Sequence, residues 1–252
     1  MGEIPTPQQN YTDISRMIDH ALLTPTLTLP ELEQGIELAI RYQVASVCIL
    51  PFYLWRCAQR LEGTGIAPST TIGFPHGGQS TAAKQAEAEF AIEAGCTELD
   101  MVVNLSLVRS GEWEAVQEDI QGVIRPAHAA RRKVKVIFEN CFLTDEQKRR
   151  LCQICGDVNA DWVKTSTGFG THGATLDDVS LMRAATPEHV QVKAAGGVRT
   201  IDDLLDFQKA GATRIGTSKT AELLDAWRTR LSLPPLTSTD LQQDEEQKNS
   251  DY

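Results

Sequence analysis

Two stretches in the second half of the chain decide the fold: Asp161-Trp162-Val163-Lys164-Thr165-Ser166-Thr167-Gly168-Phe169 and Gln191-Val192-Lys193-Ala194-Ala195-Gly196-Gly197-Val198-Arg199. Each is typical of a short apolar strand that carries a lysine near its end and runs into a glycine-containing turn. A lysine is costly to bury in a protein interior. Lysines on two neighbouring strands therefore indicate chemistry rather than packing.

On both sides of these stretches the chain alternates short apolar strands with longer amphipathic segments. Strands are predicted at 17–23, 45–50, 70–74, 98–104, 134–139, 162–166, 190–194 and 213–217. Helices are predicted at 31–43, 52–61, 82–94, 113–131, 146–155, 176–184, 201–209 and 221–231. Capping-box sequences at residues 28–31 and 144–147, with Thr175 and Thr200 as further N-caps, mark helix starts.

Eight such units in about 230 residues predict a (β/α)8 barrel. A doubly wound sheet is the alternative, but it more often stops at five or six strands. We expect one barrel domain over residues 1–231 and a disordered acidic tail over 232–252. In a barrel of this kind the active site lies at the carboxyl ends of the strands. Both lysines and the glycine-rich turns fall there.

A pair of lysines is what a Schiff-base enzyme needs. A free lysine has a pKa near 10.4, so making its amine neutral at pH 7 costs roughly 4.6 kcal/mol. A neighbouring ammonium in a poorly solvated pocket removes much of that cost. Asp100 belongs to the predicted strand Glu98-Leu99-Asp100-Met101-Val102-Val103-Asn104, whose alternation sends it inward. There it would orient the lysines and relay protons through water, or serve only as a buried counter-ion.

Composition narrows the class of protein. The chain has 252 residues and a formal charge of −10, which argues against binding nucleic acid or an acidic membrane but permits a local anion site. Neither a signal peptide nor a stretch of about 20 apolar residues is found, so we expect a cytoplasmic protein. Gly2 and Thr6 fit a short myristoylation pattern of low specificity.

The cysteines and histidines predict no metal site. Six cysteines are expected as reduced thiols, and Cys152 and Cys155 form a CxxC inside a helical pattern with no second pair. Cys48 is expected near the pocket without acting as a nucleophile. The five histidines form no recognisable ligand cluster.

Several motifs in order resemble one family, deoxyribose-phosphate aldolase, from about residue 14 to residue 231. The matching motifs are Ile18-Asp19-His20 with Leu22-Leu23, Gly73-Phe74-Pro75, Glu98 to Asn104, Val134-Lys135-Val136-Ile137-Phe138-Glu139, Val163 to Phe169, Gly173-Ala174-Thr175 and Lys193 to Thr200. The resemblance implies a class I aldolase on a (β/α)8 barrel that needs no cofactor. Its implied reaction is the reversible cleavage of 2-deoxy-D-ribose 5-phosphate to acetaldehyde and D-glyceraldehyde 3-phosphate, a step of deoxynucleotide catabolism.

The same resemblance assigns residue roles by motif. Lys164 would be the Schiff-base lysine, Lys193 the partner ammonium that lowers its pKa, and Asp100 a member of the proton relay. The partners of the protein would be small phosphosugars and aldehydes. The oligomeric state stays open, with a homo-oligomer among the possibilities.

A phosphate site is predicted in the turns after the last three strands. Glycines let backbone N–H groups approach an anion, and the helix N-terminus that follows adds positive potential. The candidate residues are Gly168, Gly170, Gly196, Gly197, Arg199, Gly216 and Ser218.

The chain departs from the family after Gly216-Thr217-Ser218, where Lys219-Thr220 replaces the usual small residues. Lys219 would add charge to the phosphate site or point outward. Tyr252 ends the predicted tail and would either close over the substrate or be incidental. Two other functions stay open: a Schiff-base aldolase for a different phosphosugar, and a sugar-phosphate binding protein without catalysis.

Overall fold

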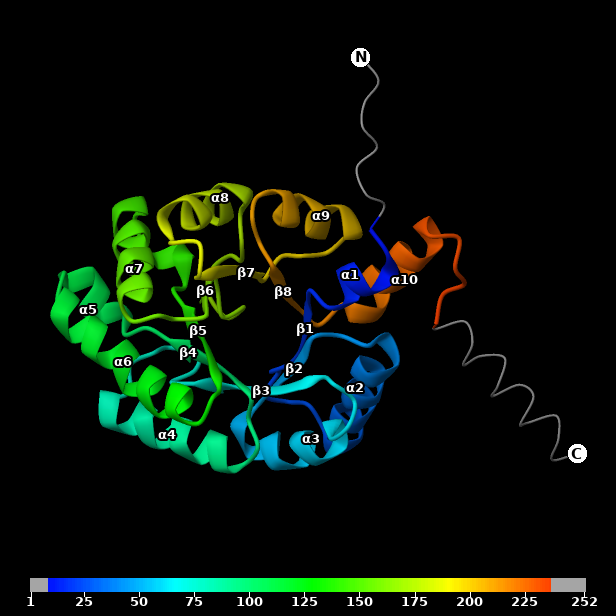
Figure 1. Ribbon diagram of the computed structural model, residues 1–252, viewed down its shortest axis with the longest axis horizontal. Coiled ribbons are helices and arrows are strands. Elements are labelled where there is room, and N and C mark those ends of the chain that lie inside the picture. Colours follow the sequence, from blue (N-terminus) through cyan, green and yellow to red (C-terminus); the bar gives the residue numbers. More distant parts are fainter. Residues whose placement is uncertain (1–8, 237–252) are drawn as a thin grey trace, which may run out of the picture.

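The computed structural model describes residues 9–236, which form a closed barrel of eight parallel strands in chain order. The strands are β1 (Ile18–Leu22), β2 (Ser46–Ile49), β3 (Ala67–Ile72), β4 (Glu98–Val102), β5 (Lys133–Ile137), β6 (Trp162–Lys164), β7 (Gln191–Ala195) and β8 (Arg214–Thr217). β8 closes the barrel against β1, with Asp19 paired to Gly216. Figure 1 shows the strands surrounded by helices. The predicted (β/α)8 barrel is confirmed, and the doubly wound sheet is excluded.

The helices follow the strands in the predicted order. They are α1 (Tyr11–Ser15), α2 (Leu29–Tyr42), α3 (Leu54–Leu61), α4 (Thr81–Glu93), α5 (Leu105–Ser110), α6 (Trp113–Ala129), α7 (Asp145–Asp157), α8 (Leu176–Ala185), α9 (Ile201–Lys209) and α10 (Thr220–Arg230), with 3-10 turns η1 (Pro51–Tyr53) and η2 (Asn140–Phe142). The short elements α1, α5 and η2 were not predicted, because segments of this length show too little periodicity. The predicted helix 52–61 covers most of η1 together with α3.

The predicted helix caps are confirmed. At the start of α2, the Glu31 carboxylate accepts hydrogen bonds from the backbone N–H and the hydroxyl of Thr28, both at 2.7 Å. Thr144 and Gln147 form a reciprocal box at the start of α7. Thr175 and Thr200 each accept a backbone hydrogen bond in the first turn of α8 and α9. Helix starts are therefore encoded locally, by side chains that satisfy otherwise unpaired N–H groups.

Several predicted boundaries were wrong, each for a local reason. β3 begins at Ala67 rather than residue 70, because Pro68 fits a strand position where its carbonyl accepts from Thr97 and no N–H is required. β4 ends at Val102 because Asn104 caps α5 by accepting from the Leu107 N–H. β5 ends at Ile137 rather than 139 because Glu139 adopts a left-handed conformation, with φ of 55°.

The register of the barrel directs charged side chains inward. Paired residues on neighbouring parallel strands project to the same face, and the pairs include Asp100 with Lys135, Lys164 with Lys193, and Lys193 with Arg214. The alternate positions, such as Val134 and Val192, are buried in the hydrophobic core. The barrel interior is therefore polar, and the apolar core lies between the strands and the surrounding helices.

Residues 1–8 and 237–252 lie outside the described part of the chain. Predictions about Gly2, Thr6, Tyr252 and most of the acidic tail therefore stay predictions. Among residues 9–236, none of the helices is both long enough and apolar enough to cross a bilayer.

Candidate active site

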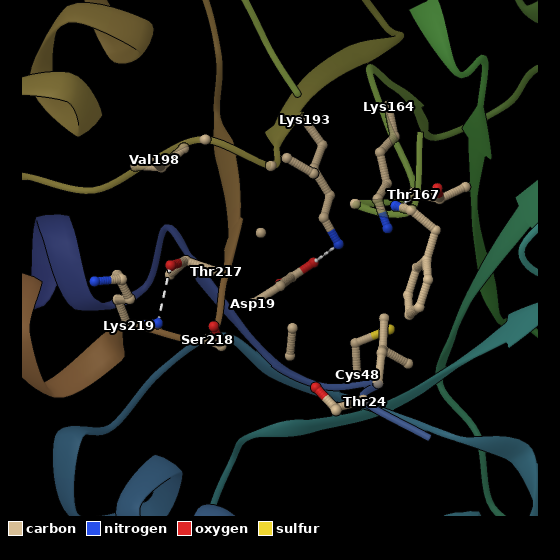
Figure 2. Close-up of a pocket in the computed structure, with 18 of the residues that line it drawn as sticks. Asp19, Thr24, Cys48, Lys164, Thr167, Lys193, Val198, Thr217, Ser218 and Lys219 are labelled. Atoms are coloured by element: carbon tan, nitrogen blue, oxygen red, sulfur yellow. Dashed lines mark hydrogen bonds and ion pairs between the residues drawn. The ribbon is translucent and has the colours of Figure 1, made fainter. Parts of the chain in front are cut away.

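A cavity of about 490 Å³ opens at the carboxyl ends of β1, β6, β7 and β8. Lys164 and Lys193 line it, together with residues of the turns that follow those strands. Figure 2 shows the two lysine side chains reaching into this pocket beside one another. Strand ends supply the lysines and the following turns supply the walls, as expected for an active site in this fold.

Lys164 and Lys193 share one carboxylate oxygen. The Nζ atom of each lies 2.8 Å from Asp100 Oδ2. Asp100 is fully buried beneath the lysines, whose exposed fractions are 3% and 1%. The structure therefore brings together all three residues predicted for catalysis, from β4, β6 and β7.

Four further charged residues extend this cluster into the barrel. Lys135 Nζ lies 2.7 Å from both Asp100 Oδ1 and Glu98 Oε2. Asp19 pairs with Lys193 and Arg214, and Arg214 also contacts Glu98 at 3.0 Å. We call these seven residues (Asp19, Glu98, Asp100, Lys135, Lys164, Lys193 and Arg214) the barrel network. Analysis of single motifs did not assign roles to Asp19, Glu98, Lys135 or Arg214, although each is a charged residue at an inward strand position.

The barrel network contains three carboxylates and four basic groups. It is electrically neutral when the carboxylates are ionised and one basic group has lost its proton. An uncompensated charge is costly in a buried environment, so this arrangement favours one neutral amine.

Lys164 and Lys193 have opposite pKa shifts. Burial lowers the pKa of Lys164, and the Lys193 ammonium lowers it further, so that together they outweigh the effect of Asp100. Burial also acts to lower the pKa of Lys193, but the carboxylates of Asp100 and Asp19 raise it above its usual value. Of the two, Lys164 therefore loses its proton more readily than Lys193.

Asp100 and Asp19 both have lowered pKa values, which favour their ionised forms. Burial alone would raise the pKa of Asp100, but the cations of Lys135, Lys164 and Lys193 hold it well below its usual value. The pKa of Asp19 is likewise lowered, because Arg214, Lys193 and Lys135 outweigh its burial. Asp100 can therefore accept hydrogen bonds from both lysines throughout the neutral pH range.

Cys48 and Thr24 also line the cavity, but their geometry supports no acid–base role for either. Cys48 lines the wall and is buried, and burial raises the pKa of its thiol, which disfavours the reactive thiolate. Thr24, from the turn after β1, also lines the cavity (Figure 2) and was not predicted. Its only sequence signal was its place after the predicted first strand.

Most of the predicted phosphate residues lie in the cavity wall: Gly168, Gly196, Gly197, Arg199, Gly216 and Ser218. Gly196 and Gly197 both have positive φ, which bends the backbone after β7. Gly173 lies so close to Gly196 that a Cβ on it would be 2.3 Å from the Gly196 carbonyl carbon. The turns after β6 and β7 therefore form one packed unit that leads to the N-termini of α8 and α9.

Gly170 is placed differently from the prediction. A Cβ on Gly170 would lie 2.7 Å from Cys141 Sγ and 2.9 Å from Glu139 Cδ, so this glycine packs against η2. Its role is to allow close packing behind the cavity wall.

Lys219 lines the cavity, but its amine is engaged elsewhere. Its Nζ pairs with Glu222 at 3.0 Å, one turn further along α10, and its side chain is 48% exposed. Figure 2 shows this amine pointing away from Lys164 and Lys193. The outward orientation is therefore the one observed.

Within residues 9–236, no cluster of histidine, cysteine, aspartate and glutamate side chains is suited to hold a metal ion. The cysteines of this region are all unpaired thiols, and only Cys141 is partly exposed.

A (β/α)8 barrel with a buried lysine pair at the carboxyl ends of its strands has charged groups where enzymes of this fold have their active sites. The family model described as DeoC/LacD family aldolase matches residues 14–227. The chain belongs to this family and is an aldolase.

The chain is similar to curated deoxyribose-phosphate aldolases. It is 60% identical to the one from Rhodopirellula baltica over 229 residues, which cover 91% of this chain and 95% of that protein. It is 43% identical to the one from Carboxydothermus hydrogenoformans, over 84% of this chain and 94% of that protein. Among solved structures, the tetrameric deoxyribose phosphate aldolase from Aeropyrum pernix superimposes with a TM-score of 0.81 at 33% identity, covering 87% and 92% of the two chains.

Proposed function

We propose that this protein reversibly cleaves 2-deoxy-D-ribose 5-phosphate to acetaldehyde and D-glyceraldehyde 3-phosphate through a Schiff base on Lys164. The observation that carries the proposal is the shared carboxylate oxygen of Asp100, which lies between a lysine whose pKa is lowered and one whose pKa is raised. The substrate is the one that the names of the relatives at 43% and 60% identity state.

The lysine supplies the chemistry without a cofactor. The neutral amine of Lys164 adds to the sugar's C1 aldehyde, and loss of water gives an iminium. This cation withdraws electrons from C2, so the C2–C3 bond breaks as the C3 hydroxyl loses its proton and becomes the aldehyde of D-glyceraldehyde 3-phosphate. The remaining enamine gains a proton at C2, and water releases acetaldehyde and the free amine.

The neighbours of Lys164 supply charge and protons. The Lys193 ammonium keeps Lys164 neutral before reaction and can donate to the oxygen that leaves as water. Asp100 contacts both amines, so a proton can move between them across one carboxylate, directly or through water. Deeper in the barrel, Lys135 and Arg214 hold the carboxylates in place.

The phosphate would lie in the turns after β7 and β8. Gly196, Gly197 and Ser218 supply backbone N–H groups, and Arg199 supplies a cation at the edge of the cavity. This position places the two ends of the sugar phosphate at opposite ends of one cavity, with C1 at Lys164.

The proposal extends to the setting of the protein. Its partners are phosphosugars and aldehydes, and nucleic acid is not among them, in keeping with the charge of −10. A homo-oligomer is proposed because the Aeropyrum pernix relative is described as tetrameric. A cytoplasmic location and a role in deoxynucleotide catabolism belong to the same proposal, supported by the unpaired thiols of residues 9–236.

Borohydride trapping tests the proposal. Reduction in the presence of acetaldehyde should leave an ethyl group on Lys164, found by peptide mass mapping, and Lys164→Arg should abolish both adduct and turnover. An adduct chiefly on Lys193 would contradict the assignment. Absence of any adduct would favour a binding protein without catalysis, and a panel of phosphosugars would reveal an aldolase for a different sugar.

A further inference from the structure

Glu139 is held in an unusual backbone conformation immediately after β5. It is a non-glycine residue with φ of 55° and ψ of 64°. The Phe138 N–H donates to the Lys164 carbonyl at 2.9 Å, and the Asn140 N–H donates to the next carbonyl, that of Thr165, at 2.9 Å. The two donors are two residues apart, but their acceptors on the neighbouring segment are consecutive residues. Glu139 is therefore an extra residue between the two donors, as in a β-bulge. Bulges of this kind re-aim a side chain and occur next to active sites.

The bulge aims the Glu139 carboxylate at the turn that follows Lys164. The backbone N–H of Thr167 lies 3.3 Å from each carboxylate oxygen, and the Thr167 hydroxyl donates a short hydrogen bond to Oε2. Gly170 closes over the same carboxylate, where a Cβ would lie 2.9 Å from Glu139 Cδ. Glu139 is only 2% exposed, so all of these contacts are shielded from water.

The hydrogen bonds of the Thr167 hydroxyl can be fully counted. A hydroxyl has one proton to donate and two lone pairs to accept with. The proton goes to Glu139, and one lone pair accepts from the Phe169 N–H at 3.0 Å. One lone pair remains on a side chain that lines the cavity beside Lys164, as Figure 2 shows. The carboxylate thus leaves this hydroxyl able only to accept a further hydrogen bond.

The same contacts fix the outer wall of the cavity. Phe169 lines the cavity and packs edge to face on Phe74, from the turn after β3, with ring centroids 5.4 Å apart. Its backbone N–H is held by Thr167, and Thr167 is held by Glu139. The chain of contacts from Glu139 to the Phe169 ring therefore sets the shape of the cavity wall on the side of β3.

We propose that Glu139 is a positioning residue for the sugar, because it fixes the Thr167 hydroxyl as an acceptor for a hydroxyl group of the substrate between its aldehyde and its phosphate. The identity of the sugar rests on the proposed function. Acetaldehyde has no hydroxyl group to present, so its reaction with Lys164 does not use this contact.

Glu139→Gln tests the inference, because the amide keeps the size of the side chain but loses one acceptor and the charge. It should lower kcat/KM for 2-deoxy-D-ribose 5-phosphate about 10- to 100-fold, the range expected for a lost hydrogen bond to a charged group. Deuterium exchange from solvent into acetaldehyde should stay within about threefold of the unaltered protein. A general loss of structure would reduce both reactions equally, and that outcome would overturn the inference.

Thr167 variants test the same contact from its other side. Thr167→Val should lower kcat/KM for the sugar as much as Glu139→Gln does, and the double variant should lose no more than either alone, since the two residues act as one unit. Thr167→Ser, which keeps the hydroxyl, should retain more sugar cleavage than Thr167→Val. Losses that multiply in the double variant would show that Glu139 does not act through Thr167.

Glu31→Gln is the matched control, since Glu31 accepts from the N–H and hydroxyl of Thr28 in the same manner but at the start of α2. Hydrogen–deuterium exchange over residues 167–170 gives a readout that does not depend on the substrate. Exchange of these backbone amides should be faster in Glu139→Gln and unchanged in Glu31→Gln. Unchanged exchange in Glu139→Gln would overturn the inference. If the unaltered protein forms no adduct on Lys164, the proposed function fails. The backbone hydrogen–deuterium exchange of residues 167–170 then still shows whether Glu139 holds this turn in place.

Discussion

Lys164 and Lys193 donate to the same oxygen of Asp100, each at 2.8 Å, yet their pKa values move in opposite directions. The difference comes from their other neighbours. Lys193 also pairs with Asp19, whereas the only carboxylate within salt-bridge distance of Lys164 in the described chain is Asp100. The two lysines are therefore not equivalent, which supports the proposed roles of Lys164 as nucleophile and Lys193 as supporting cation.

Lys193→Leu should shift the activity toward alkaline pH. The ammonium of Lys193 helps to lower the pKa of Lys164, and its loss also leaves more of the Asp100 charge acting on Lys164. The pKa of Lys164 therefore rises, and turnover at pH 7 should fall by more than about tenfold, since each pKa unit changes the neutral fraction tenfold. The pH dependence of kcat/KM measures the shift, with Lys193→Arg as the charge-retaining control. Near-normal turnover with an unchanged profile would show that Lys193 does not have this role.

The buried lysines should differ in their effect on stability. The pKa of Lys164 is lower in the folded than in the unfolded state, so below an unfolded pKa of about 10.4 the folded state is disfavoured, and this cost disappears as the pH rises toward that value. Lys164→Leu should therefore raise the free energy of unfolding at pH 7, and the gain should shrink at pH 9. Urea unfolding at both pH values measures it.

Lys135→Leu should have the opposite effect. The pKa of Lys135 is raised well above its usual value, because Asp100, Glu98 and Asp19 outweigh its burial. Its loss leaves buried carboxylates short of a partner and should cost about 3–5 kcal/mol of folding free energy. The same urea experiment at pH 7 tests this. Equal destabilisation by Lys135→Leu and Lys164→Leu would contradict the proposed division between a structural and a neutral lysine.

Ser218→Asp should weaken binding of the phosphorylated sugar. Ser218 lines the cavity at the end of β8, and a carboxylate there would repel the phosphate. KM for 2-deoxy-D-ribose 5-phosphate should rise about tenfold or more, and KM for unphosphorylated deoxyribose should rise much less. Ser180→Asp, on the exposed surface of α8, adds the same charge as a control. Equal effects on both sugars would place the phosphate elsewhere.

Gly173→Ala should disrupt the turns after β6 and β7. A Cβ at this position would be 2.4 Å from the Gly196 carbonyl oxygen, a distance that the backbone must relieve by moving. We expect a loss of stability of about 1–3 kcal/mol together with a raised KM for the phosphorylated sugar. Gly78→Ala is the control, because nothing lies within 4 Å of a Cβ there. Thermal unfolding and steady-state kinetics of both variants give the answer, and similar behaviour of the two would show that this contact is not needed.

Local patterns along the chain are enough to predict the barrel and the candidate catalytic residues. Alternating strand and helix patterns, with local caps such as Thr144 and Gln147, are short-range features that each segment carries independently. The inward direction of Asp100, Lys164 and Lys193 likewise follows from a period of two along each strand. The predicted ends of strands were wrong where one residue departs from regular strand geometry, as Glu139 does after β5.

The interactions among these charges depend on contacts between strands that are far apart in the chain. Closure of the barrel brings Asp19 and Arg214, 195 positions apart in the chain, into contact and completes a network of three carboxylates and four basic groups. The pKa of Lys164 depends on its burial and on distances to side chains from other strands, which strand periodicity does not specify. The same holds for Glu139, whose carboxylate reaches Thr167 because a local bulge turns it toward a neighbouring strand. Composition and spacing thus identify which residues are present at the strand ends, whereas the closed barrel sets whether the pKa of each is raised or lowered.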